Sequence, residues 1–177
     1  FLENLGATHS VWLGKGIAGD DTHGHVDDLC RFVSEKAIVL CREKDPKDAN
    51  YRALEENRER LQDARLADGS KPEVVDLPMP APLVFDGRRL PASYANFYVA
   101  NAAVLVPTFN DANDGLALGI LAEHFKGRPV VGIHAVERFL GDQALKLGWA
   151  FEKPVQESGK RVLIVGAGPS GLTAAYH

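Results

Sequence analysis

Apolar positions along the chain follow two periods, and each period predicts a different kind of element. Short apolar runs that alternate with polar residues are typical of strands, whereas apolar residues three and four positions apart indicate helices. Read in this way, the chain contains two similar successions of strand, strand, helix and strand. The first covers residues 25–77 and the second covers residues 93–133. The pattern therefore predicts an α/β fold built from tandem units.

The bounds of the expected elements follow from the turn residues between them. The first unit has predicted strands at 25–33, 37–41 and 73–77 and a helix at 48–66. The second has predicted strands at 93–99, 102–106 and 129–133 and a helix at 115–125. Asp48 is the expected cap of the first helix, whose many Glu and Arg residues predict a solvated face without a site. Tyr94 and Asn96 are expected to pack and to form hydrogen bonds. Because a small unit buries its own helix poorly, we expect the units to pack around a common centre.

The end of the chain has a different pattern. A helix is expected at 136–149 and a linker at 152–160, and the apolar run 161–165 predicts a buried strand. Gly166, Gly168 and Gly171 follow this strand with GxGxxG spacing and precede a helical segment. A strand, a glycine-rich turn and a helix bind the pyrophosphate of a dinucleotide at the helix N-terminus. We therefore expect residues 161–177 to be the start of a Rossmann-like domain, which would hold FAD or NAD(P) only if that domain were complete.

Composition narrows the class of protein. Hydrophobic residues make up 45% and charged residues 25% of the 177 residues, as in ordinary globular proteins. The net charge of −4 and the lack of a basic patch argue against nucleic acid as a partner. No apolar stretch approaches the length of a membrane span. Two cysteines do not make a disulfide framework, so we expect a cytoplasmic protein. Because the first residue is Phe1, we interpret the sequence as an internal fragment.

The densest chemistry lies between Asp20 and Asp28, where four carboxylates and two imidazoles occupy nine residues. On a strand at 25–33, the alternation of side chains would place His25 and Asp27 on the same face and Cys30 on the other. A histidine titrates near neutrality, and a neighbouring carboxylate favours its charged form or binds a cationic substrate. This pair therefore predicts a metal-free acid–base site.

Two other interpretations of the cluster remain open. It is also compatible with a polar loop of solvated carboxylates in front of a strand. As a metal site, His23 and His25 would chelate one ion, with Asp20 or Asp27 as a further ligand. The histidines that follow form no ligand-spaced pair; they are His124, His134 and His177.

Several segments resemble the agmatine deiminases, in the same order as in that family. They are residues 12–17 (WLGKGI), 19–27 (GDDTHGHVD), 77–80 (LPMP), 93–98 (SYANFY), 104–109 (VLVPTF) and 128–133 (RPVVGI). The resemblance covers about residues 1–134. It implies the pentein fold, in which five strand-strand-helix-strand blades surround an axis. The two predicted units would be two of these blades, and residues 1–134 would form a partial propeller domain.

The resemblance also implies a reaction. Agmatine deiminases hydrolyse agmatine, a small guanidino compound, to N-carbamoylputrescine and ammonia in putrescine and polyamine biosynthesis, without a metal or cofactor. By its place in the motif, His25 is the general acid and base, and Asp27 is a carboxylate that binds the guanidinium. Asp20 and Asp21 lie in the matching stretch and are candidate substrate-binding residues. The unpaired edges of an incomplete propeller would favour association of copies into a homo-oligomer.

The chain departs from the family where the nucleophile is expected. In the family a cysteine thiolate follows the strand that matches 129–133, in a glycine-rich segment ending in His-Cys. This chain has VERFLGD at residues 136–142, and no cysteine follows Cys41. Cys30 and Cys41 are expected to be buried, unreactive thiols. We therefore expect the chain to be inactive as a deiminase.

The tail suggests two explanations for this departure. Residues 137–142, 158–160 and the GxGxxG segment resemble the small subunit of glutamate synthase and related flavin- and NADPH-dependent oxidoreductases. In one explanation the chain is a chimera, with a deiminase fragment joined near 132–136 to the start of an oxidoreductase, and with residues 135–160 as a helix and linker. In the alternative, the chain is the N-terminal part of an oxidoreductase, and its pentein domain is a binding module.

Overall fold

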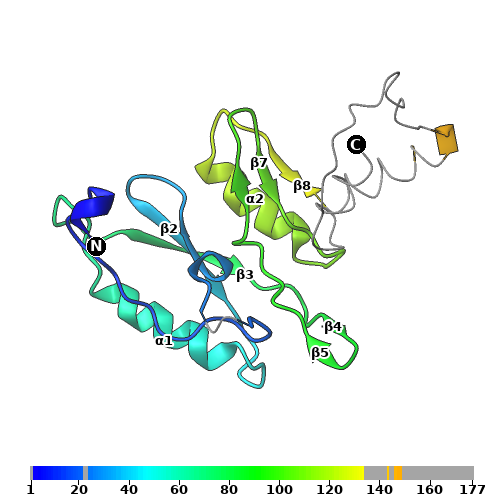
Figure 1. Cartoon of the computed structure of the whole chain (residues 1–177), viewed down its shortest axis with the longest axis horizontal. Helices are drawn as coiled ribbons and strands as arrows, with labels where there is room; N and C mark the ends of the chain where they lie inside the picture. Colours follow the sequence, from blue (N-terminus) through cyan, green and yellow to red (C-terminus); the bar gives the residue numbers. More distant parts are fainter. Residues whose placement is uncertain (1, 22–23, 134–142, 144–145, 149–177) are drawn as a thin grey trace, which may run out of the picture. The chain divides into compact units, whose positions relative to one another are not determined.

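A computed structural model describes residues 2–21, 24–133, 143 and 146–148 (Figure 1). The predicted Rossmann-like segment lies outside these residues, together with Gly166, Gly168 and Gly171. His23 and His134 also lie outside them. The chain divides into two units, residues 1–142 and 143–177. The helices and strands named below all belong to the first unit.

The first predicted succession forms a three-stranded sheet with one helix. Its strands are β1 (Cys30–Phe32), β2 (Ala37–Arg42) and β3 (Glu73–Pro78), and α1 (Tyr51–Gln62) connects β2 to β3. β1 pairs with β2 in antiparallel orientation, whereas β3 pairs with β2 in parallel orientation. The central strand β2 is buried along almost its whole length, as its continuous apolar run requires.

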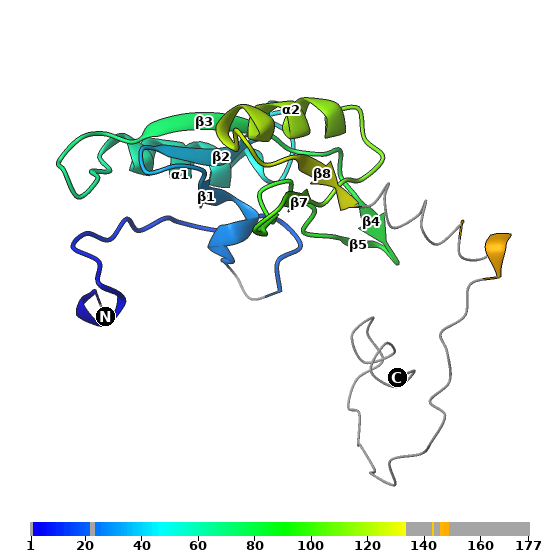
Figure 2. The same ribbon diagram turned by 90° about the horizontal axis from the view of Figure 1, so that it is seen from above.

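The second predicted succession repeats this topology. β6 (Tyr98–Val99) is antiparallel to β7 (Val104–Val106), α2 (Asp114–His124) follows, and β8 (Val130–Gly132) is parallel to β7. α2 contacts β8 in its own unit and also β3 of the preceding sheet (Figure 2). The predicted tandem strand-strand-helix-strand arrangement is therefore confirmed, and neither sheet is closed among the described residues.

Further elements precede and connect the two sheets. A short 3-10 helix, η1 (Glu3–Leu5), lies near the start, and a second, η2 (Val26–Asp28), precedes β1. Between the sheets, β4 (Val84–Phe85) and β5 (Arg88–Arg89) form a hairpin. Asp86 and Gly87 have positive φ angles in its two-residue turn, which suits the twist of a tight hairpin. No described helix is long and apolar enough to cross a membrane.

One apolar core extends through both sheets. Its most deeply buried large side chains are Leu29, Leu40, Leu54, Leu77, Tyr94, Val104, Val106 and Leu121. The Tyr94 ring lies edge-on against Phe109, with the ring centroids 5.3 Å apart, and its hydroxyl donates to Asp114 Oδ1 over 2.7 Å. Tyr94 is therefore a packing and hydrogen-bonding residue, as its position in the sequence indicated.

Three predicted elements are longer than the observed ones by at least three residues at one end, and side-chain hydrogen bonds account for two of these differences. The expected strand at 25–33 begins as η2 and becomes a strand only at Cys30, because Asp20 binds the amides at the start of this segment. The expected strand at 93–99 shrinks to β6, because the Ser93 hydroxyl accepts from the Ala95 amide and turns the chain. The first helix covers 51–62 instead of 48–66. Asp48 binds the Asn50 amide just before it.

Candidate functional site

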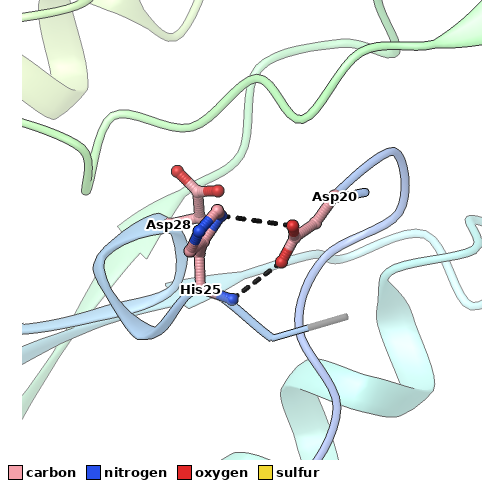
Figure 3. A group of neighbouring side chains, drawn as sticks. All are labelled: Asp20, His25 and Asp28. Atoms are coloured by element: carbon pink, nitrogen blue, oxygen red, sulfur yellow. Dashed lines mark hydrogen bonds and ion pairs between the residues drawn. The ribbon is translucent and has the colours of Figure 1, made fainter. Parts of the chain in front are cut away.

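Asp20, His25 and Asp28 form a compact cluster, called here the site cluster (Figure 3). Each residue offers one nitrogen or oxygen atom, and these three atoms lie within 4.8 Å of one another. His25 Nδ1 is 3.2 Å from Asp20 Oδ1. Within the described part of the chain, this is the one group of three acidic, histidine or cysteine side chains close enough to share an ion.

Asp20 fixes both the backbone and the ring of His25. Its Oδ2 accepts hydrogen bonds from the amides of Gly24, at 2.9 Å, and His25, at 2.7 Å. Its Oδ1 faces the imidazole. The Asp20 side chain is 1% exposed, whereas that of His25 is 54% exposed. A buried carboxylate therefore orients a histidine that small molecules can reach. A histidine bound to a carboxylate through Nδ1 can transfer protons through Nε2.

Asp28 joins the cluster from η2 and ties it to the second sheet. The residue is 4% exposed, and its Oδ1 accepts a hydrogen bond of 2.8 Å from Asn96 Nδ2. Burial raises the pKa of the Asp28 carboxyl, and the Asn96 hydrogen bond opposes this effect. The charges of Asp27 and Asp20 raise the pKa further, while His25 lowers it. Asn96 is thus a hydrogen-bonding residue, as expected.

The glycine-rich loop before Asp20 lies directly against the start of the His25 segment. A Cβ atom added to Gly16 would lie 2.9 Å from Gly24 Cα and 3.1 Å from Asp20 Oδ2. The distance to the Gly24 backbone is too short for a side chain and the distance to Asp20 is tight, so the close approach of these two segments favours glycine at this position. The sequence GKGIAGD therefore brings the Asp20 carboxylate to the Gly24 and His25 amides.

The structure places one candidate site residue beside His25 and corrects the expected arrangement of another. The side chain of Asp20 contacts the imidazole of His25. The shared strand face of His25 and Asp27 is wrong, because His25 precedes a 3-10 helix that contains Asp27. Asp27 is half-buried and Asp21 is exposed. Asp28 was not among the site residues predicted from the sequence. The signal that could have indicated it is the pair of consecutive aspartates, Asp27 and Asp28, close after His25.

Neither cysteine is positioned as a reactive thiolate. Burial raises the pKa of the Cys30 thiol to about 12. Burial also raises the pKa of Cys41 to about 11, although Ser93, 3.2 Å from its Sγ, opposes the shift. Both side chains are thus protonated at neutral pH and are poor nucleophiles. Cys41 is buried as expected, whereas Cys30 is only half-buried, and the raised pKa values of both agree with the expectation of unreactive thiols.

The site cluster also has the donor set of a small cation site. Two carboxylates and one imidazole suit a divalent metal ion. His23, which the metal hypothesis needs as a second imidazole, lies outside the described residues. Hydrogen bonds from Gly24, His25 and Asn96 already use oxygens of both carboxylates. The geometry therefore suits an acid–base histidine at least as well as a metal ligand.

Comparison with known proteins gives a consistent set of relatives. The family model described as Porphyromonas-type peptidyl-arginine deiminase matches residues 1–143. An agmatine deiminase of Medicago truncatula is 38% identical over 149 residues, which cover 73% of this chain and 40% of that protein. The tail from residue 144 onward lies beyond the family match.

Solved structures show the same likeness. A structure from Porphyromonas gingivalis named "Putative Arginine Deiminase" has 43% identity and a TM-score of 0.71, over 75% of this chain and 39% of its own. A variant agmatine deiminase of C. jejuni with substrate bound has 33% identity and a TM-score of 0.66, over 74% of this chain and 38% of its own. The described fold therefore resembles the pentein deiminases. The chain spans roughly 40% of the length of the relatives it matches.

Proposed function

The chain belongs to the Porphyromonas-type peptidyl-arginine deiminase family, and from this premise we propose that residues 1–143 carry the histidine and carboxylates of a guanidino-group hydrolase. The observation that carries the proposal is the buried Asp20 carboxylate, which holds the half-exposed His25 ring at 3.2 Å. Agmatine is the proposed substrate, because the relatives include agmatine deiminases.

The charge of the site suits such a substrate. A guanidinium is a planar cation whose N–H groups pair with carboxylates in a charge-assisted, often bidentate way. Four aspartates lie within nine residues around His25. In the proposed reaction Asp27 binds the guanidinium, with Asp20 or Asp21 as a second carboxylate. In the complete reaction of the family a cysteine thiolate adds to the guanidinium carbon. His25 would protonate the amine as it leaves as ammonia, and would then activate the water that displaces the thiolate. The product would be N-carbamoylputrescine, an intermediate of putrescine biosynthesis.

The covalent step of the family needs a thiolate, and we propose that this chain does not provide one. Cys30 and Cys41 are its two cysteines, and burial raises the pKa of both thiols. Acid–base residues and carboxylates need no metal or organic cofactor for this hydrolysis. A dinucleotide site in the tail, cytoplasmic location and self-association remain predictions from the sequence. No observation on the described residues favours the oxidoreductase alternative.

The first test is a titration with agmatine, compared with putrescine, which has the same carbon chain and lacks the guanidine. We expect agmatine, but not putrescine, to shift the imidazole NMR signals of His25, which His25→Gln assigns by their loss. The His124 signals on α2 are the internal reference and should not move. Asp27→Asn should weaken agmatine binding roughly tenfold, because a charge-assisted pair is lost. Equal responses to the two ligands would overturn the proposed specificity.

A further inference from the structure

We propose that Asn50 and Asn57 are positioning residues that hold the loop 14–20, and through it the Asp20 carboxylate, in place against His25. Asn50 is the N-cap residue of α1 and Asn57 lies within it. The sequence predicted no site on this helix. The consequence of this positioning for catalysis rests on the proposed function.

Asn57 binds the beginning of the loop at two points. Its Oδ1 accepts from the Gly14 amide over 2.6 Å, and its Nδ2 donates to the Lys15 carbonyl over 2.9 Å. The residue is 0% exposed. A buried amide side chain is stable only if its polar atoms are hydrogen-bonded. Here Asn57 forms hydrogen bonds with two backbone groups of the loop, the Gly14 amide and the Lys15 carbonyl.

Asn50 binds the other end of the loop. It occupies the N-cap position of α1, where asparagine ordinarily accepts a hydrogen bond from its own helix. It makes no such bond. Its Oδ1 accepts instead from the Ala18 amide over 2.7 Å, and the residue is 1% exposed. The Asn50 side chain therefore accepts a hydrogen bond from the loop and none from the first turn of the helix.

The two asparagines act on one face of the helix. They are seven residues apart, which is two helical turns, so their side chains point in the same direction. Leu54 and Leu61 are also buried, and they anchor α1 to the core. An asparagine in the middle of a helix lowers helical propensity relative to alanine. Asn57 is thus better explained by its loop contacts than by a contribution to the helix itself.

Because Asp20 is at the end of the loop, the hydrogen bonds of the two asparagines also fix the position of its carboxylate. After the anchored Ala18 amide come Gly19 and Asp20. The Asp20 carboxylate then binds the Gly24 and His25 amides, at 2.9 and 2.7 Å. Loss of either asparagine contact frees one end of the loop, which allows Asp20 to move away from these amides and from the imidazole.

The test follows the backbone amides of Gly24 and His25 in the full chain, because both donate to Asp20. Asn50→Ser keeps a good helix cap but is too short to reach Ala18. We expect it to accelerate hydrogen exchange of both amides about tenfold and to move their proton resonances upfield, since charge-assisted hydrogen bonds are weakened. Asn57→Ala should do the same. Asn50→Asp retains the acceptor oxygen and should restore wild-type behaviour.

Leu54→Ala is the matched control, because it damages α1 packing between the two asparagines and leaves the side chains that form hydrogen bonds with the loop unchanged. It should lower overall stability and leave the Gly24 and His25 resonances in place. Resonance changes in Leu54→Ala equal to those in Asn50→Ser, or none in Asn50→Ser, would overturn the positioning role. If Asn57→Ala does not fold, the positioning role is tested by Asn50→Ser and Asn50→Asp alone. The role requires altered Gly24 and His25 amides in the first variant and wild-type amides in the second. Altered amides together with absent agmatine binding would refute the proposed function and retain the positioning role.

Discussion

Replacing Gly19 by alanine is expected to lower the free energy of unfolding by roughly 3 kcal/mol, through backbone strain and a steric clash together. Gly19 has a φ of +94°, in the region that L residues adopt at a cost. A Cβ there would lie 2.5 Å from the Arg89 carbonyl oxygen and 2.9 Å from Pro91 N. These are backbone atoms at the base of the β4–β5 hairpin, so rotation of a side chain cannot relieve the contact.

The variant Gly69→Ala separates the effect of backbone strain on stability from the effect of the steric clash. Gly69 has a φ of +80°, and nothing lies within 4 Å of its added Cβ. This variant should lose only the strain contribution, about 1 kcal/mol. Urea unfolding of both variants measures the difference. Because Gly19 immediately precedes Asp20, we also expect Gly19→Ala to weaken the contact between Asp20 and His25. Equal losses in the two variants would contradict the clash.

The variant Asn96→Asp is expected to lose roughly 2 kcal/mol at pH 7, because it removes the hydrogen-bond donor of the buried Asp28 and places a second carboxylate beside it. The Asn96 amide now donates to Asp28 Oδ1 over 2.8 Å. Two carboxylates at this distance share one proton, which raises the pKa of one of them strongly. The loss should therefore be largest at neutral pH and shrink at pH 4, where one carboxyl is protonated.

The raised pKa of Asp28 in the wild-type chain determines whether stability rises or falls with pH. Burial raises the pKa of Asp28 in the folded state above its ordinary value of 3.8. The contribution of Asp28 to stability is then fully present below that value and is lost as pH rises through the raised pKa. Asn96→Asp strengthens the same trend. The double variant Asp28→Asn with Asn96→Asp restores one carboxylate and one amide and should recover most of the stability. Failure of this exchange to recover stability would contradict a direct pairing.

The repeat was predictable from the sequence because its signals are local. The apolar run of β2 and the apolar spacing in α1 each follow from neighbouring residues. β2 forms where expected, and α1 forms within the predicted range but is shorter at both ends. The tandem topology followed from repeating this pattern. Burial of Cys41 was likewise predictable from its place in the apolar run.

The geometry of the site was not predictable, because it depends on contacts between distant residues. Asp20 binds amides up to five positions away and turns a segment that alternation would make a strand. Asp28 becomes part of the cluster through Asn96, sixty-eight residues later in the chain. Asn57 lies among Glu and Arg residues that suggested a wholly solvated face, yet it reaches a loop forty-three residues earlier. Periodicity carries no information about such pairs.

We propose that this chain has the acid–base histidine and carboxylates of a guanidino hydrolase but no reactive thiolate. Ammonia release from agmatine, measured on a sample of the full chain that binds agmatine, tests it most directly. We expect no release above the buffer blank, in the wild-type chain and in His25→Ala alike. Release that is abolished by His25→Ala and by Cys30→Ala or Cys41→Ala would contradict this expectation, because one of these two thiols would then be the nucleophile.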